Sequence, residues 1–297
     1  MKTPRWSALA LAALLMVAAS PSAKPPLDTA RIEALTAAKG KLDEKEGTFK
    51  VSVPRTDLDV RAVGVKITPP MGLTSWAAFK HIGTHTVVMG DMVLREDQVN
   101  PVLSVALDNG LEVTALHNHL AFETPRIMFM HIGGMGSEAG LAEAVGKVFA
   151  RINETAAASP EPQGPEIDPA KTTLDPSKIE AILHEKATLA GGVYKVVVGR
   201  TSHMHGAVVG NTMGVNTWAA FAGSDDRAVV DGDFAMLESE VQGVLKALRR
   251  ADINIVAIHQ HMLGETPRII FLHYWGVGST EALAKGLRMA LDRTRRK

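Results

Sequence analysis

The chain has 297 residues, of which 46% are hydrophobic and 22% are charged. This composition is ordinary for a folded globular protein, and the length is enough for two modest domains. Lysine plus arginine equals aspartate plus glutamate at 32 each, so no net charge attracts nucleic acid or an acidic membrane. Cysteine is absent, which excludes disulfides, thiolate catalysis and a lipid anchor attached through an N-terminal cysteine.

The first 23 residues have the order of a secretory signal peptide. Lys2 and Arg5 precede an apolar run over 6–19, and small residues follow up to Ala23. The run is short for a membrane span, and Pro21 would stop a continuing helix. We therefore predict a signal peptide over 1–23, a periplasmic or secreted protein, and no stable membrane insertion after cleavage. The alternative is a buried apolar helix at the N-terminus.

Most of the remaining chain is a duplication. Residues 71–151 align without a gap with residues 213–293, and about 30 of roughly 80 positions are identical. The match continues upstream with a small change of length, and a Pro/Ala-rich stretch separates the two copies. We predict one repeat domain over 27–154, a linker over 155–173, and a second repeat domain over 174–297. The two repeats are expected to pack against each other.

Each copy is predicted to run helix, several strands, helix, two strands, helix. In the first copy, alternating apolar residues predict a strand near 49–53, and two further strands are expected before and after Gly83. Apolar spacing from Val99 predicts a helix that ends at 109–110. Ser137, and Ser279 in the second copy, have the features of an N-cap of the last helix. This order predicts an α+β fold, with a mainly antiparallel sheet packed against helices in each of two tandem domains. A cupin barrel is excluded because it needs a nearly all-β chain.

Histidines recur at matching positions in the two copies. His117 and His119 are separated by one residue on a predicted strand, so their side chains share a face. If the next strand folds back antiparallel, His131 lies opposite Ala115 and joins them. We expect this register because Val113 and Ala115 share a face with His117, and Phe129 shares one with His131. The histidines are therefore expected beside the core. Imidazole binds zinc, copper and nickel, with zinc expected first. The predicted metal ligands are His117, His119, His131, His259, His261 and His273.

An E-T-P-R turn lies between the histidines of each copy. Glu123 and Glu265 are candidates for an oxygen ligand, a partner of a histidine, or a general base for a metal-bound water. Arg126 and Arg268 are candidates for binding an anionic cofactor or substrate, or they pair with the glutamate three residues earlier.

Other residues are also repeated in both copies. Asp91 and Asp233, which follow Gly90 and Gly232, are either metal ligands from a facing strand or turn residues. Trp76 and Trp218 are expected in the core.

Three functions remain open from the residues. The first is a transition-metal site, either a binding site or part of a metal-dependent enzyme. The second is a module that binds an anionic small molecule or peptide between the repeats through Arg126 and Arg268. The third is a structural module whose histidines hydrogen-bond in the core. The chain has no HExxH, G-x-S-x-G or phosphate-binding glycine motif, so any catalysis is expected to depend on a metal.

These motifs together resemble the LppY/LpqO family of secreted bacterial proteins. The resemblance rests on W-A-A-F, G-D, the H-x-H pair, E-T-P-R and F-x-H, and it covers nearly all of the chain after residue 23. It implies export and two tandem copies of a domain of unknown function, and it implies no activity. Family members called lipoproteins have a lipobox cysteine, which this chain lacks, so a free exported form is expected.

Overall fold

The computed structural model describes residues 26–157, 164 and 166–294. The predicted signal peptide over 1–23 lies outside these residues. Within the described ranges, no helix has both the length and the apolar character needed to cross a membrane.

The first copy of the repeat follows the predicted order of elements. Its last helix begins after the expected cap, because the side chain of Ser137 accepts a hydrogen bond from the N–H of Gly140. The elements are α1 (Thr29–Thr36), β1 (Gly40–Asp43), β2 (Thr48–Pro54), β3 (Val60–Ala62), β4 (Val65–Ile67), η1 (Pro69–Met71), β5 (Thr74–Ile82), β6 (His85–Arg95), α2 (Glu96–Asp108), β7 (Glu112–Asn118), β8 (Glu123–Thr124), β9 (Ile127–Gly136) and α3 (Glu138–Glu154).

The second copy repeats this order with a shorter connection before its long hairpin. The elements are η2 (Pro169–Lys171), α4 (Pro176–Leu183), β10 (Thr188–Ala190), β11 (Val193–Gly199), β12 (Ser202–Met204), β13 (Ala207–Val209), η3 (Asn211–Met213), β14 (Asn216–Gly223), β15 (Ala228–Leu237), η4 (Glu238–Glu240), α5 (Val241–Arg250), β16 (Asn254–His259), β17 (Ile269–Gly278) and α6 (Thr280–Leu291).

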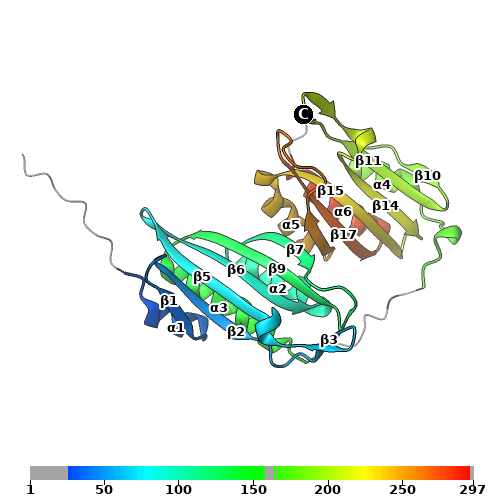
Figure 1. Cartoon of the computed structure of the whole chain (residues 1–297). Coiled ribbons are helices and arrows are strands. Elements are labelled where there is room, and N and C mark those ends of the chain that lie inside the picture. Colours follow the sequence, from blue (N-terminus) through cyan, green and yellow to red (C-terminus); the bar gives the residue numbers. More distant parts are fainter. Residues whose placement is uncertain (1–25, 158–163, 165, 295–297) are drawn as a thin grey trace, which may run out of the picture.

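The strands of both copies form one antiparallel sheet (Figure 1). Its order is β1-β2-β5-β6-β9-β7 from the first copy, followed by β16-β17-β15-β14-β11-β10 from the second. The predicted α+β fold, with mainly antiparallel strands and helices in each copy, is confirmed. The sequence reasoning did not anticipate that the two sheets join edge to edge.

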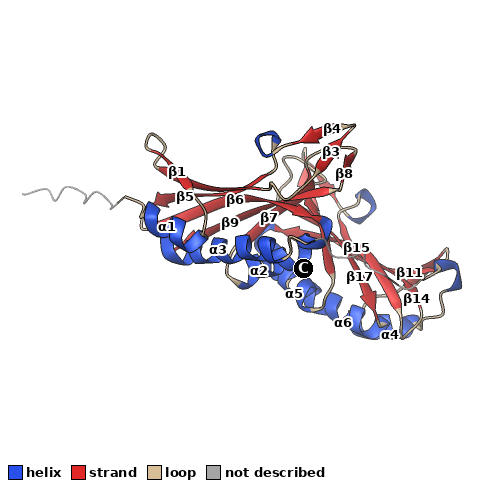
Figure 2. Ribbon diagram, turned by 90° about the horizontal axis from the view of Figure 1, so that it is seen from below, coloured by secondary structure: helices blue, strands red, loops and turns tan. Residues whose placement is uncertain are grey.

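The helices cover one face of this sheet (Figure 2). The main core lies between them and the strands, where Phe79, Met130 and Ile132 are fully or almost fully buried. Burial of each such side chain contributes about 1.5 to 3 kcal/mol. Among the described residues, the opposite face carries the three strands β4-β3-β8, the pair β12-β13 and the short 3-10 helix η1, but no α-helix. We call this opposite side the helix-free face.

The two copies meet at Leu116 of β7 and Ile258 of β16, which pair antiparallel. These residues occupy the same position in their respective copies, so the copies are related by a pseudo-two-fold axis beside this pair. Both side chains are buried in the main core on the helix side. Residues immediately before and after them therefore point to the helix-free face.

One prediction about the faces was wrong. We expected Val113 to share a face with Ala115 and His117, so that the histidines would lie beside the core. The structure has a register irregularity between Val113 and Ala115, which inserts a residue and reverses the alternation of side chains. Val113 therefore packs in the main core, whereas Ala115 and His117 point to the helix-free face. The same irregularity occurs between Ile255 and Ala257 in the second copy.

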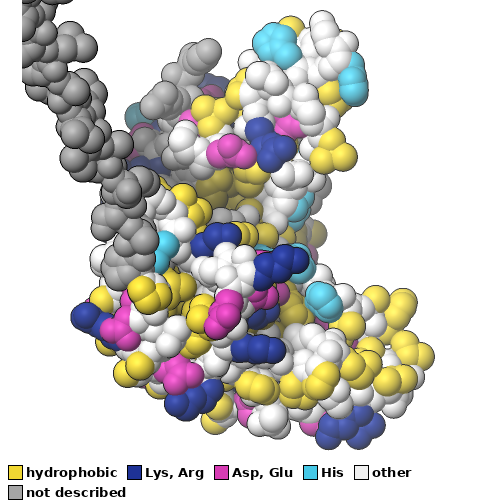
Figure 3. All heavy atoms as spheres, turned by 60° about the vertical axis from the view of Figure 1, so that its left-hand side comes forward, with side chains coloured by type: hydrophobic (Ala, Val, Ile, Leu, Met, Phe, Trp, Pro, Cys, Tyr) yellow, Lys and Arg dark blue, Asp and Glu magenta, His cyan; other side chains and the backbone are white. Residues whose placement is uncertain are grey.

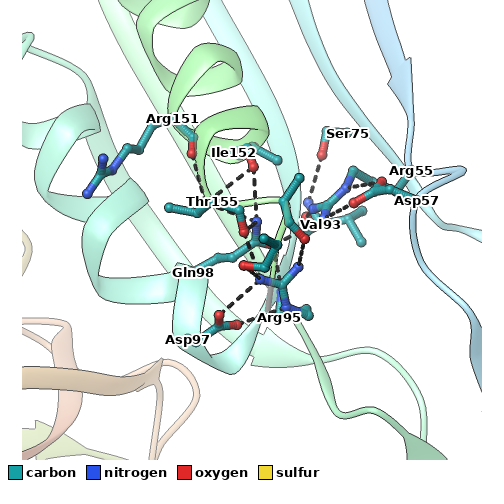
Figure 4. A network of polar contacts seen from close by, with 12 residues as sticks. Arg55, Asp57, Ser75, Val93, Arg95, Asp97, Gln98, Arg151, Ile152 and Thr155 are labelled. Carbon is teal, nitrogen blue, oxygen red and sulfur yellow. Dashed lines mark hydrogen bonds and ion pairs between the residues drawn. The ribbon is translucent and has the colours of Figure 1, made fainter. Parts of the chain in front are cut away.

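A buried polar network contacts β6, the strand that carries Asp91, near its C-terminal end (Figure 4). Pairing of β5 with β6 stops at Trp76 and Asp91, so the backbone of Val93 needs other partners. Its N–H donates to Ser75 Oγ over 2.9 Å, and its carbonyl accepts from the buried Arg55 guanidinium. The second copy does the same, since Ala235 bonds to Thr217 and Arg200. In both copies, side chains therefore replace the strand-to-strand hydrogen bonds two residues after the aspartate.

Candidate functional site

The first histidine site consists of Asp91, His117, His119 and His131 on the helix-free face. The predicted register is confirmed, because His131 lies opposite Ala115. Asp91 is a strand residue of β6 and lies opposite His131 on the other side. The nearest atoms of these two side chains, Asp91 Oδ2 and His131 Nε2, are 3.9 Å apart.

His117 and His131 bring two ring nitrogens together. Their Nε2 atoms are 3.0 Å apart, close to the roughly 3.3 Å between two nitrogen ligands of one tetrahedral zinc ion. His117 Nδ1 lies 2.8 Å from the carbonyl oxygen of Asn118. Since a carbonyl only accepts, Nδ1 carries the proton, and Nε2 of the neutral ring presents its lone pair. A backbone carbonyl that orients a histidine in this way is common around protein-bound metals.

His119 is set slightly apart from the other two histidines. It follows the last residue of β7 and stacks on Phe129, with ring centroids 4.5 Å apart. Phe129 belongs to a small apolar cluster on the helix-free face that also contains Leu73 and Val93. This cluster is the apolar neighbour of the site, in place of the main core that we had expected.

The second histidine site consists of Asp233, His259, His261 and His273. Asp233, His259 and His261 each offer a ligand atom, and these atoms lie within 4.8 Å of one another. The Nε2 atoms of His259 and His261 are 3.1 Å apart. Asp233 Oδ2 lies 3.8 Å from His261 Nε2 and 3.8 Å from His273 Nδ1. His261 stacks on Phe271, the counterpart of Phe129.

The two copies combine their histidines differently. His117 contacts His131 in the first copy, whereas His259 contacts His261 in the second and places its ring 4.5 Å from that of His273. Five of the six predicted histidines thus contact another histidine of the same copy, and the sixth, His119, acts through its charge on Asp91.

Burial makes an unpaired negative charge on either aspartate unfavourable. Loss of water around Asp233 raises the pKa of its carboxyl to about 6, although nearby His273 lowers it in part. Burial likewise raises the pKa of Asp91, and the histidines around it and Lys50 act in the opposite direction. A cation at either site would compensate for this cost.

The histidines of the second site favour their neutral form. Burial, followed by the neighbouring His273 and His261, lowers the pKa of His259 to about 4. Burial and His273 also lower the pKa of His261. Neutral imidazole is the form that binds metals, so both rings are ready to act as ligands at neutral pH.

Unsatisfied polar atoms gather at these motifs. In the part of the chain that the structure describes, four buried side-chain nitrogen or oxygen atoms have no hydrogen-bond partner. Two of them, Asp91 Oδ1 and His259 Nδ1, belong to the histidine sites, and a third, Glu123 Oε1, belongs to the E-T-P-R turn. Since a buried polar group without a partner costs about 1 to 3 kcal/mol, such a concentration points to a ligand.

The two glutamates of the E-T-P-R turns lie beside the small strands. Glu123 begins β8, which pairs with β3 on the helix-free face. Glu265 is 6% exposed, and its Oε1 accepts a hydrogen bond from the backbone N–H of Ile269 over 3.1 Å. Glu265 therefore fixes the end of the turn where β17 begins. An added chemical role for either residue stays a prediction.

The two arginines of these turns have partners other than those predicted. Arg126 lies 3.8 Å from Glu96, the first residue of α2, and Arg268 lies 3.6 Å from Glu238 in the second copy. All four side chains are more than half exposed. Their role in binding an anion stays untested.

Sequence reasoning missed a cation beside each site. Lys50 Nζ lies 3.9 Å from the ring centroid of Trp76, and Lys195 Nζ lies 4.1 Å from that of Trp218. Trp76 pairs with Asp91, and Trp218 pairs with Asp233. We had expected both tryptophans in the core, but they are half-buried on the helix-free face. The repetition of Lys50 and Lys195 after matching aromatic residues was the available signal.

The comparison with solved structures gives two matches of low similarity. One is the trimeric bacterial microcompartment shell protein PduB, 12% identical, with a TM-score of 0.20. The other is EtuB from Clostridium kluyveri, 10% identical, with a TM-score of 0.24. Each comparison covers 86% of this chain and 89% of the other chain. TM-scores this low do not indicate a shared fold.

No curated protein matches the chain. A family model matches it twice, over residues 30–151 and 177–293, and each match contains one complete histidine site. The chain therefore belongs to the family described as Domain of Unknown Function (DUF1259), of which it contains two copies.

Proposed function

We propose that the protein is an exported transition-metal protein of the LppY/LpqO type, with one metal ion at each histidine site. The ligands in the first copy are Asp91, His117, His119 and His131. Those in the second copy are Asp233, His259, His261 and His273. Periplasmic or extracellular location follows from the signal-peptide pattern over 1–23.

One observation carries this proposal: ligand atoms of Asp233, His259 and His261 lie within 4.8 Å of one another around a buried carboxylate. The same residue types occupy the matching positions of the first copy. Purely structural histidines would satisfy buried neighbours, yet Asp91 Oδ1 and His259 Nδ1 have no partner among the described residues. A metal ion compensates for the buried carboxylate and accepts the lone pairs of the neutral rings.

The chemistry of these groups favours zinc, followed by copper and nickel. Three imidazoles and one carboxylate suit these borderline ions, and zinc accepts four such ligands in tetrahedral geometry. The sites open onto the helix-free face, where the side chains of His131 and His273 are 39% and 45% exposed. Small molecules therefore have access to the site, and a bound ion can act as a Lewis acid.

A metal-dependent enzyme is the more specific form of the proposal. Glu123 and Glu265 are the candidates for a general base, because each lies on the turn that connects the strands bearing the histidines. The buried, unpartnered Oε1 of Glu123 favours this role in the first copy. In the second copy the hydrogen bond from Ile269 occupies Oε1 of Glu265 and leaves Oε2 as the candidate atom.

Metal analysis of protein purified without a histidine tag tests the proposal. We expect close to two equivalents of zinc per chain, and one equivalent in the double variant His117→Ala/His131→Ala. The matched control is His85→Ala, which removes an exposed histidine at the β5–β6 turn and should leave two equivalents. Absence of bound transition metal, together with no thermal shift on adding zinc, copper or nickel, would overturn the proposal.

A further inference from the structure

The two histidine sites belong to one continuous row of side chains on the helix-free face. The row crosses ten neighbouring strands of the sheet, and its residue types follow the same order from either end. We call it the polar band. Its residues are Lys50, Trp76, Asp91, His131 and His117, followed by His259, His273, Asp233, Trp218 and Lys195.

Strand register places the residues of each half side by side. In the first half, Trp76 pairs with Asp91, and Asp91 pairs with His131. Residues that pair across neighbouring strands have side chains on the same face, about 4.5 to 5.5 Å apart. The second half has the same pairs, from Trp218 to Asp233 and from Asp233 to His273.

The two halves of the band meet at the pseudo-two-fold axis. His117 and His259 are the residues that follow Leu116 and Ile258, the pair that joins β7 to β16. In antiparallel strands these two histidines are diagonal neighbours, with backbones roughly 7 to 8 Å apart. Because His117 leans toward His131 and His259 toward its own partners, the centres of the two sites are at least two strand spacings, about 10 Å, apart.

A lysine closes each end of the band. Both lysines are exposed, and the charge of Lys50 acts on Asp91 and lowers the pKa of its carboxyl. Each is held over a tryptophan ring at about the same distance, 3.9 Å and 4.1 Å. This contact is retained in both copies although the chain between lysine and tryptophan differs in length. Each end therefore offers a fixed, available positive charge next to the metal site.

Figure 3 shows one side of the molecule with all atoms as spheres. Histidine side chains lie there beside basic and acidic ones, next to a hollow between the two halves. Two metal ions and two lysines would outweigh Asp91, Asp233 and the exposed Asp231, which lies beside Asp233 on the same face, so a bound partner is expected to be anionic.

We propose that the polar band binds one linear ligand with an anionic oxygen group, a carboxylate or a phosphate, at each end. Each end contacts one metal ion and the lysine of the same half. The two-fold arrangement presents the same groups in opposite directions, which suits a ligand whose ends are identical. This inference rests on the proposed function, because the metal ions supply part of the attraction.

Calorimetric titration of the zinc-loaded full chain tests the proposal. The probes are linear dicarboxylates from malonate to dodecanedioate, α,ω-bisphosphates of the same lengths, and the matching monocarboxylates. Short dicarboxylates reach one site only, whereas those that span about 10 Å or more engage both sites. We expect the best length to bind about 100-fold more tightly than its monocarboxylate, because the second contact is intramolecular.

Variants identify the residues responsible. The double variant His259→Ala/His261→Ala should keep one zinc ion and bind dicarboxylates no better than monocarboxylates. Lys50→Met/Lys195→Met should keep two zinc ions and lose at least about tenfold in affinity for the best dicarboxylate, while Lys50→Arg/Lys195→Arg should restore it. Two bound zinc ions without any gain from length would overturn the inference and leave the metal function intact. Failure to bind zinc would instead overturn the proposed function and, with it, this inference.

Discussion

Asn100 on α2 and Gln242 on α5 are counterparts in the two copies, and each binds the backbone of the opposite copy. Asn100 accepts a hydrogen bond from the N–H of Ile255 and donates to its carbonyl. Gln242 forms the same two bonds with Val113. Val113 and Ile255 are the residues at which the strand register is irregular, so these side chains satisfy backbone groups that the sheet leaves free.

Removal of either amide should therefore weaken the junction between the copies. We expect Asn100→Ala and Gln242→Ala each to lower the free energy of unfolding by about 1 to 3 kcal/mol, because two partly buried backbone groups lose their partner. Urea denaturation measures this. The control is Asn153→Ala, which changes an exposed residue on α3 and should alter stability by less than about 0.5 kcal/mol. Equal effects of all three variants would show that the amide contacts do not hold the copies together.

Asp233→Asn should make the metal-free protein more stable at pH 8 and abolish metal binding at the second site. The pKa of Asp233 is raised from 3.8 to about 6 in the folded state. The folded protein therefore holds this proton more tightly, and the advantage is present below pH 4 and lost as pH rises through about 6. Asparagine avoids the cost of the charge at pH 8, on the order of 1 to 3 kcal/mol, and its Oδ1 can still accept the hydrogen bond from Leu272.

The matched control for this change is Asp231→Asn on the same strand and face. Asp231 is exposed, so its replacement should leave stability almost unchanged and retain zinc. Thermal melts of both variants with and without zinc compare the two effects. If Asp233→Asn destabilised the metal-free protein, the aspartate would be a structural residue and the proposed ligand role would fail.

The metal-free protein should also lose stability as pH falls because of His259. Burial and the neighbouring histidines lower the pKa of His259 from 6.5 to about 4. The unfolded chain takes up a proton first, so the contribution of this residue is complete above pH 6.5 and declines toward pH 4. His259→Asn should reduce the decline over this window. NMR of ring-labelled histidine checks the cause directly: a metal-free His259 that titrates near 6.5 would contradict it.

Sequence reasoning anticipated the local structure well because its signals are local. Ser137 and Ser279 cap their helices as expected, since a serine before an amphipathic stretch needs no distant partner. The register between His131 and Ala115 also followed from the hairpin alone. The duplication carried each of these features into the second copy.

The face of the sheet on which the histidines lie could not be predicted in the same way. One inserted residue between Val113 and Ala115 reverses the alternation, and it is stabilised by Gln242, which lies far away in the sequence. The edge-to-edge joining of β7 and β16 likewise depends on two surfaces that form only after each copy has folded. The role of Lys50 could not be predicted because its contact with Trp76 joins two neighbouring strands that are distant in the sequence.

Glu265 offers a last test that separates support of the turn from chemistry at the metal. Its Oε1 accepts the N–H of Ile269 in a buried setting, so Glu265→Ala should cost about 1 to 3 kcal/mol of stability by leaving that N–H unpaired. Glu265→Gln keeps an oxygen acceptor and should retain most of the stability. Neither variant should change the zinc content, because the metal ligands proposed in this copy do not include Glu265. A loss of zinc in Glu265→Gln, measured on folded protein, would instead make the glutamate a metal ligand.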